Sequence, residues 1–284
     1  MKSDPMKPAI VKLLCALLLH NIFISCKKDN TGLYPDGNTR PDLEIIETLP
    51  PVQTAVHYDI TANCAGFYRA LPARYDSTTK HYPLLIFLHG AGEMGNGTTD
   101  LPKVLKNAVP NLINKKKFPP SFTAGGKNFS FIVLSPQVKN WTTPEDVYAM
   151  IKYAIAKLRV DTTRIYVTGL SLGGNTTWNF AAKYGQVVAA VVPICASNTA
   201  TASKTKAIAS RNIPVWTFHN EDDPAAPVQK TKDFVQLINS YNPNPKARIT
   251  LWPTGGHDAW TKATNPSYRE NGMNIYEWML QYHK

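Results

Sequence analysis

The feature that most constrains the fold of this chain is the segment 169–173, which reads Gly-Leu-Ser-Leu-Gly. Residues 164–168 before it are rich in strand-forming side chains, and residues 176–184 after it are typical of a helix. Two glycines in a strand–turn–helix setting permit a turn so sharp that the central residue is strained and its side chain is exposed at the top of a sheet. A glycine-rich turn with an incidental serine is the alternative. The segment predicts an α/β fold that presents Ser171.

Further strands are predicted by continuous apolar runs, which are typical of strands buried on both faces of a parallel sheet. These runs are residues 83–88, 131–134, 187–193, 213–218 and 248–252. Residues 55–75 predict an entry strand or hairpin. No internal repeat or low-complexity tract interrupts this pattern.

The predicted helices alternate with these strands. The clearest has one apolar stripe at helical spacing, formed by Val147, Met150, Ile151, Ala154, Ile155 and Leu158. Thr143 can cap this helix, and Pro144 fits its first turn. Helices are also predicted over 228–238 and 274–282. The alternation predicts a doubly wound, mostly parallel sheet with helices on both faces.

Residues 94–128 have a mixed pattern. Residues 101–113 are predicted to be helical with an interruption at Pro110, and residues 119–126 to be a loop. The segment is expected to lie over the mouth of the sheet. No insertion is long enough for a separate cap domain, so an open cleft is expected.

The N-terminus predicts an export signal. Lys2, Lys7 and Lys12 precede a largely apolar stretch over 13–25, which is too short to span a bilayer. A small residue followed by Cys26 resembles the lipobox of bacterial lipoproteins, in which that cysteine is lipidated. Phe23 stands where leucine is usual, so ordinary signal cleavage or a retained helix remains open.

The domain organisation predicted from these patterns has three parts. Residues 1–25 form a lipoprotein-type signal peptide, residues 26–52 a polar tether rich in Pro, Gly, Asn and charge, and residues 53–284 the catalytic domain. The expected location is therefore the periplasm or cell surface, with a lipid anchor at Cys26 as the membrane contact.

The charge and the cysteines exclude some partners. The net charge is +11, but the basic residues are dispersed apart from residues 115–117, and no nucleic-acid-binding pattern appears. Nucleic acid is therefore not an expected partner. Cys64 and Cys195 have no metal-binding spacing; two buried free thiols are favoured, and a disulfide in an oxidising compartment remains open.

Two later loops carry the groups that a serine nucleophile requires. A hydroxyl needs a base within hydrogen-bond reach, and that base needs a third group to orient it. Residues 219–224, His-Asn-Glu-Asp-Asp-Pro, follow the strand at 213–218, and residues 255–260, Gly-Gly-His-Asp-Ala-Trp, follow the strand at 248–252. Ser171, an acid near position 223 and His257 thus occur in the order nucleophile, acid, histidine.

A metal site is the alternative for these two loops. It would use ligands from the set His219, Asp222, Asp223, His257 and Asp258. Because a metal site leaves the 169–173 segment unexplained, no metal or other cofactor is predicted.

These segments together give the chain a family resemblance. Residues 83–93, 164–174, 215–223 and 256–257 resemble the α/β-hydrolase superfamily. More closely, the chain is similar to the secreted esterases related to dienelactone hydrolase, feruloyl esterase and polyhydroxybutyrate depolymerase, often labelled prolyl oligopeptidase-like. The resemblance covers roughly residue 58 to the C-terminus and is more specific for fold and catalytic residues than for substrate.

The resemblance implies the catalytic roles. Ser171 matches the nucleophile and His257 the general base. Asp223, with Pro227 four residues on, matches the acid, while Asp222 is the competing assignment. Asn220 replaces the usual glycine of the acid loop; it either alters the loop or adds a substrate contact.

The surroundings of the nucleophile follow from the same resemblance. The backbone N–H groups of Leu172 and Ala91 would form the oxyanion hole. His89 and His219 are interpreted as structural residues of their own turns. Loops that should reach the cleft rim carry four candidate substrate contacts, each with a surface or packing role as the alternative: Glu93, Gln137, Trp141 and Trp260.

The function expected from the resemblance is hydrolysis of carboxylic esters through an acyl-enzyme, without a cofactor. The substrate would be a small-molecule ester or an ester linked to plant polysaccharide, such as an acetyl or feruloyl group. The alternatives are a serine peptidase of the prolyl oligopeptidase-like type, for which 284 residues leave no room for a propeller domain, and a non-catalytic binding protein on a hydrolase scaffold. The sequence predicts no oligomeric state.

Overall fold

The computed structural model describes residues 46–284. The predicted signal peptide, Cys26 and most of the predicted tether lie outside the described residues. The folded part begins before residue 53, because Glu47 is buried and accepts a hydrogen bond from the backbone N–H of Arg74. Within residues 46–284, no helix has the length and apolar character needed to cross a bilayer.

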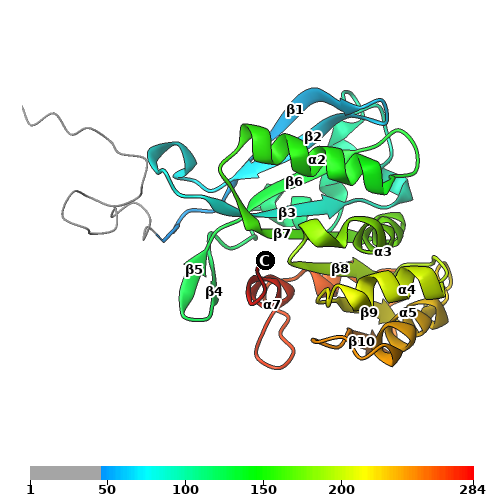
Figure 1. Ribbon diagram of the computed structural model, residues 1–284. Helices are drawn as coiled ribbons and strands as arrows, with labels where there is room; N and C mark the ends of the chain where they lie inside the picture. The colour runs from blue at the N-terminus through cyan, green and yellow to red at the C-terminus, as the bar shows by residue number, and fades with distance from the viewer. Residues whose placement is uncertain (1–45) are drawn as a thin grey trace, which may run out of the picture. The chain divides into compact units, whose positions relative to one another are not determined.

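The centre of the molecule is an eight-stranded sheet with the strand order β1-β2-β6-β3-β7-β8-β9-β10 (Figure 1). The strands are β1 (Val52–Thr61), β2 (Cys64–Leu71), β3 (Tyr82–Leu88), β6 (Ile132–Gln137), β7 (Val160–Leu170), β8 (Ala190–Ile194), β9 (Trp216–Asn220) and β10 (Arg248–Trp252). β1 and β2 form an antiparallel hairpin, and β2 pairs antiparallel with β6. The strands β6, β3, β7, β8, β9 and β10 pair in parallel, in this order. The entry hairpin and the mostly parallel sheet are thus confirmed.

Helices cover both faces of this sheet. One face carries α2 (Pro144–Lys157), α3 (Leu172–Tyr184), α4 (Ala202–Ser210) and α5 (Val228–Ser240), which Figure 1 labels. The other face carries α1 (Ala108–Asn114), α6 (Trp260–Ala263) and α7 (Ile275–Leu280). Strand β3 shows why its sequence is continuously apolar. Leu84 and Ile86 point into one core and Leu85 and Phe87 into the other, since successive side chains of a strand alternate between faces. This is the α/β-hydrolase architecture that was predicted.

The capping of α2 also follows the sequence. Thr143 accepts a hydrogen bond from the backbone N–H of Asp146 at 3.2 Å, and the Asp146 carboxylate accepts from the backbone N–H of Thr143 at 3.0 Å. This reciprocal pair satisfies two donors that the first turn of a helix leaves free. The helix therefore begins at Pro144, as predicted.

Residues 94–128 differ from the prediction. The helical part breaks at Asn107, which is extended, and not at Pro110, which lies in the first turn of α1 where its missing N–H is harmless. The predicted loop contains a short hairpin of β4 (Phe122–Ala124) and β5 (Lys127–Phe129). Phe122 packs on Tyr276 of α7 with ring centroids 4.8 Å apart, so the hairpin lies on one face of the sheet and not over its mouth.

Candidate active site

Ser171 lies in the turn between β7 and α3 and has an unusual backbone conformation, with φ 51° and ψ −112°. A non-glycine residue at positive φ is strained, and such strain gathers at functional sites. The turn is held by a hydrogen bond from the Ser171 N–H to the carbonyl of Ile194 at 2.9 Å. Close packing adds to this, because a Cβ on Gly173 would lie 2.1 Å from the Leu88 carbonyl oxygen. The serine side chain remains partly exposed.

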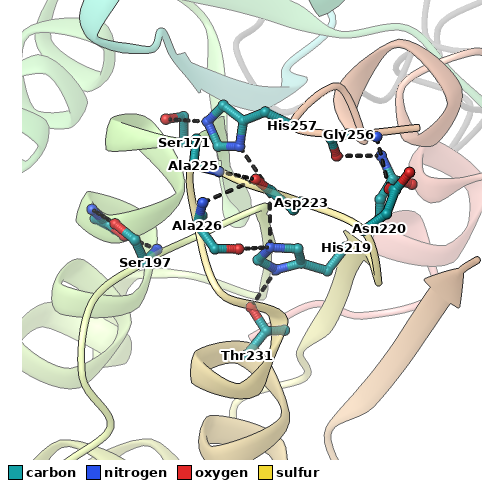
Figure 2. Close-up of polar contacts among 12 residues, drawn as sticks. Ser171, Ser197, His219, Asn220, Asp223, Ala225, Ala226, Thr231, Gly256 and His257 are labelled. Carbon is teal, nitrogen blue, oxygen red and sulfur yellow. Dashed lines mark hydrogen bonds and ion pairs between the residues drawn. The ribbon is translucent and has the colours of Figure 1, made fainter. Parts of the chain in front are cut away.

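His257 links Ser171 to Asp223 (Figure 2). Its Nε2 lies 2.8 Å from Ser171 Oγ, and its Nδ1 lies 2.7 Å from Asp223 Oδ2. The carboxylate is an acceptor, so Nδ1 carries a hydrogen and donates a hydrogen bond to Asp223. Nε2 of the neutral ring then accepts from the serine hydroxyl. This is the arrangement in which the imidazole acts as a base toward Ser171.

Asp223, and not Asp222, is the acid that contacts His257. Asp223 is buried, and its Oδ1 accepts hydrogen bonds from the N–H groups of Ala225 at 2.8 Å and Ala226 at 2.9 Å. Burial raises the pKa of Asp223, but the hydrogen bonds from His257 and the two amides outweigh burial and hold that pKa below its usual value. The carboxylate therefore stays ionised.

The exposed neighbour Asp222 has a different contact. Its carboxylate accepts from the N–H groups of Gly255 at 3.2 Å and Gly256 at 2.8 Å. These two glycines directly precede His257. Asp222 thus ties the acid loop to the histidine loop and does not itself reach the imidazole.

A second histidine contacts Asp223. His219 is 0% exposed, and its Nε2 lies 3.1 Å from Asp223 Oδ2 and 2.8 Å from the carbonyl oxygen of Ala226. Its Nδ1 lies 2.8 Å from Thr231 Oγ1 (Figure 2). The contact with Ala226 agrees with the interpretation of His219 as a residue of its own turn. The contacts with Asp223 and Thr231 were not predicted, since no local pattern indicates them.

The loop after β3 brings a second backbone segment next to Ser171. A Cβ on Gly90 would lie 3.6 Å from Ser171 Cβ, so the Gly90 backbone passes close to the serine side chain. His89 holds this loop: its Nδ1 donates to the Gly90 carbonyl at 2.6 Å, and its Nε2 accepts from the Val138 N–H at 3.2 Å. Burial lowers the pKa of His89, which suits this neutral, structural role.

The two N–H groups predicted for the oxyanion hole lie at comparable places. Leu172 is the first residue of α3, and Ala91 is the first residue of a short 3₁₀ helix, Ala91–Glu93. The first N–H groups of a helix have no acceptor within it. One follows Ser171 directly, and the other follows Gly90, so both are available beside the serine.

Three of the candidate substrate contacts are buried, among them two that were predicted for the rim. Glu93 is buried: it accepts from the Gly90 N–H at 2.9 Å and from the side chain of Asn107, and burial raises its pKa. Gln137, at the end of β6, is 0% exposed, and its amide bonds to the backbone of three residues of the 93–100 segment. Asn220 is also buried and donates to the Gly256 carbonyl at 2.9 Å. Each shapes a loop of the site through its hydrogen bonds.

The two tryptophans remain accessible. The Trp141 side chain is 66% exposed on the loop between β6 and α2. That loop is held to α3, because Thr176 donates its hydroxyl to the Thr142 carbonyl at 3.0 Å. Trp260, partly buried, meets the His257 ring edge to face at 5.4 Å between centroids. Trp260 thus lies directly beside the His257 imidazole, whereas Trp141 is exposed on a loop that is tied to α3.

The two cysteines of the described residues do not form a disulfide. Cys64 and Cys195 are buried free thiols, as favoured from the sequence, and burial raises the pKa of Cys64 to about 12. No three His, Cys, Asp or Glu side chains in the described part of the chain are grouped as metal ligands would be.

Comparisons with known proteins place the chain among ester hydrolases. A family model described as phospholipase/carboxylesterase matches residues 75–265. The chain is 22% identical over 196 residues to the bifunctional acetylxylan esterase/xylanase XynS20E of Neocallimastix patriciarum. This match covers 69% of this chain and 26% of that protein. The chain therefore spans about a quarter of the length of this relative.

Solved structures show the same fold at low identity. A thermostable esterase superposes with a TM-score of 0.58 at 24% identity, covering 84% of this chain and 64% of that one. A ferulic acid esterase superposes with a TM-score of 0.53 at 17% identity, covering 74% and 92%.

Proposed function

The chain belongs to the phospholipase/carboxylesterase family, and on that premise we propose that it hydrolyses carboxylic esters through an acyl-enzyme on Ser171. One observation carries the proposal. Ser171 Oγ, the His257 imidazole and the Asp223 carboxylate form a continuous hydrogen-bonded chain with links of 2.8 and 2.7 Å. An activated nucleophile needs this arrangement, in which the base is within reach of the hydroxyl and is itself oriented.

Acylation follows from the protonation states of these groups. As Ser171 Oγ attacks the ester carbonyl carbon, His257 Nε2 takes the hydroxyl proton, and the carbonyl π electrons move to the oxygen. Asp223, buried and ionised, stabilises the imidazolium that forms. When the tetrahedral intermediate collapses, the imidazolium gives its proton to the departing alkoxide, and the alcohol leaves.

The developing oxyanion needs its own donors, and we assign the N–H groups of Leu172 and Ala91 to this role. Each such donor contributes about 3 to 4 kcal/mol of transition-state stabilisation. Deacylation repeats the sequence, with water in place of the serine hydroxyl: His257 takes a proton from the water, the hydroxide oxygen attacks the acyl carbon, and Ser171 Oγ leaves and is reprotonated.

The test of this function uses the full chain, with Ser171→Ala as its partner. A fluorophosphonate probe should label the wild type and not the variant, and the variant should lose at least about 10⁴-fold in kcat on p-nitrophenyl acetate. A folded wild type that neither reacts with the probe nor hydrolyses esters would instead support a binding protein on a hydrolase scaffold.

The substrate class is proposed more narrowly as acetyl or feruloyl esters of plant polysaccharide. Support comes from the names of similar proteins, an acetylxylan esterase/xylanase and a ferulic acid esterase. Trp141 and Trp260 are the proposed substrate contacts, because aromatic side chains offer large, rigid contact area. Trp141→Ala should raise KM about three- to tenfold for acetylated xylan and leave p-nitrophenyl acetate hydrolysis unchanged.

A substrate panel separates this proposal from the peptidase alternative. Methyl ferulate, p-nitrophenyl acetate and acetylated xylan would be compared with proline-linked amides of similar size. Esters should be cleaved faster in kcat/KM. Faster cleavage of the amides would replace the esterase proposal with a serine peptidase.

The cellular location is proposed from the N-terminal sequence. Its lysines, short apolar stretch and Cys26 support export and a lipid anchor, which would hold the domain in the periplasm or at the cell surface. In a bacterial host, a palmitate analogue should label the wild type and not Cys26→Ala. Equal labelling of both would overturn the lipid anchor.

A further inference from the structure

The hydrogen bonds of Asp223 include one donor that the proposed mechanism does not use. The carboxylate accepts from the N–H groups of Ala225 and Ala226, from His257 Nδ1, and from His219 Nε2. Both histidines meet the same oxygen, Oδ2, at 2.7 Å for His257 and 3.1 Å for His219. The orientation of the oxygen that faces His257 therefore depends on a second imidazole.

The contacts of His219 determine where its proton lies. Nε2 faces two oxygens that only accept, Asp223 Oδ2 and the Ala226 carbonyl, so Nε2 must carry a hydrogen. Nδ1 is then free to accept from the hydroxyl of Thr231, which is buried in the first turns of α5. Both ring nitrogens of His219 are therefore hydrogen-bonded although only Nε2 carries a proton.

The surroundings of His219 keep this ring neutral. Burial lowers its pKa, and this effect exceeds the opposing effects of the Ala226 carbonyl and Asp223. The titratable groups that act on its pKa are Asp223 and His257, while the Cys195 thiol, directly after the adjacent strand β8, has its pKa raised by burial and stays uncharged. Asp222 is directed to the amides of 255–256. No other charge in the described residues contacts the ring.

The geometry points to His219 as a positioning residue, held by Thr231, that orients the Asp223 carboxylate toward His257 with a neutral hydrogen bond. This inference rests on the proposed function. A neutral donor has an advantage over a charged one here: an imidazolium would neutralise Asp223 and weaken its stabilisation of the His257 imidazolium. The donor therefore fixes the carboxylate without removing the charge that catalysis needs.

Loss of this donor has a defined electrostatic consequence. With one hydrogen bond fewer, Oδ2 carries more of the unshared negative charge and stabilises protonated His257 more strongly. The acid limb of the kcat/KM profile, which reports protonation of the free enzyme's base, should then move to higher pH. A residue that only supports the fold would lower the amount of active protein and leave this limb in place.

Matched substitutions of the full-length protein test the inference. In His219→Gln the amide nitrogen replaces Nε2 and keeps a neutral donor toward Asp223, whereas in His219→Asn the shorter amide keeps only the contact with Thr231. Per active site titrated with fluorophosphonate, His219→Asn should lose about 10- to 100-fold in kcat/KM. Its acid limb should rise by about 0.5 pH unit or more, and His219→Gln should stay near the wild type.

Thr231 offers a second pair if His219→Asn does not fold. Thr231→Val removes the hydroxyl at nearly constant volume and should lose about three- to tenfold in kcat/KM, with a smaller shift in the same direction. Thr231→Ser keeps the hydroxyl and should match the wild type. Wild-type kcat/KM and pH profile in both His219→Asn and Thr231→Val would overturn the inference, as would equal losses in His219→Asn and His219→Gln with an unmoved acid limb.

A measurement that needs no activity separates this inference from the proposed function. ¹⁵N NMR of the wild type should show His219 as the neutral Nε2–H tautomer at neutral and alkaline pH. A His219 that is protonated at neutral pH, or that carries its proton on Nδ1, would overturn the inference even in an active enzyme. If His219 shows the expected tautomer but the protein hydrolyses no ester, only the proposed function is overturned.

Discussion

The serine turn and the two loops that carry Asp223 and His257 are held in place by different forces. The turn is fixed by backbone contact, because Ser171 N–H bonds to the Ile194 carbonyl and Gly173 packs against the end of β3. The strands and the helix around Ser171 therefore enforce its strained backbone conformation.

The acid and histidine loops are joined across 34 residues of sequence by side-chain hydrogen bonds. Asn220 donates to the Gly256 carbonyl, Asp222 accepts from two glycine amides, and His219 contacts Asp223. Substitutions in the turn should therefore disturb the fold, whereas substitutions in the loops should disturb activity in a folded protein.

The largest effect is expected at the acid. Asp223→Asn keeps the shape but removes the acceptor that fixes the His257 tautomer, and kcat should fall by about 10³- to 10⁴-fold. Steady-state kinetics on p-nitrophenyl acetate measure this. Asp222→Asn is the matched control: its side-chain oxygen can still accept from the Gly256 N–H, so the loops stay joined and kcat should stay within about threefold of the wild type. An equal loss in both variants would mean that the acid is wrongly assigned.

A large effect of another kind is expected in the serine turn. Gly173→Ala places a Cβ 2.1 Å from the Leu88 carbonyl oxygen, so the backbone must shift. The free energy of unfolding should fall by about 3 kcal/mol or more in urea denaturation. Gly92→Ala is the control, because its Cβ would meet nothing within 4 Å. If Gly173→Ala were as stable as the control, close packing would not be what holds the turn.

A moderate effect is expected where the two loops meet. Asn220→Ala removes the hydrogen bond to Gly256 and should lower kcat/KM about tenfold with the fold intact. Asn239→Ala loses two hydrogen bonds to Ala247 in another part of the molecule, so it should lose stability and keep kcat/KM. Unfolding curves and kinetics of both variants would be compared. Unchanged kcat/KM in Asn220→Ala would show that this link does not position His257.

The smallest effect concerns stability and pH. The pKa of Asp223 is lower in the folded protein than its ordinary value of 3.8, so its stabilisation is present above that value and is lost as pH falls through the folded pKa. The Tm of the wild type minus the Tm of Asp223→Asn should therefore be smaller at about pH 3 than at pH 7. Thermal denaturation measures it; a constant difference would contradict the direction of the pKa change.

The difference between local and long-range contacts also explains which elements could be predicted from the sequence. Strand β3 and helix α2 were predicted because their burial patterns and the Thr143 cap are local. The hairpin at 122–129 was missed, since it is stabilised by packing of Phe122 on Tyr276, far along the chain.

Side-chain burial in the loops limited the prediction of the site. Glu93 and Gln137 come after predicted strands, where exposed polar residues are common, and were therefore predicted to reach the rim, while Asn220 was a candidate substrate contact. In the structure each is buried because its hydrogen-bond partners lie on segments brought close only by folding. No sequence spacing indicates such partners.

The sequence by itself determined the alternation of strands and helices, the strained turn at Ser171 and the order of the serine, the acid and the histidine. These depend on apolar periodicity and on glycines at fixed positions, which act over a few residues. The tertiary structure decided that Asp223 and not Asp222 meets His257, and that His219 supports it. The physical reason is that a buried carboxylate is stabilised by donors from whichever segments surround it, and those segments meet only when the parallel sheet brings the ends of β9 and β10 together.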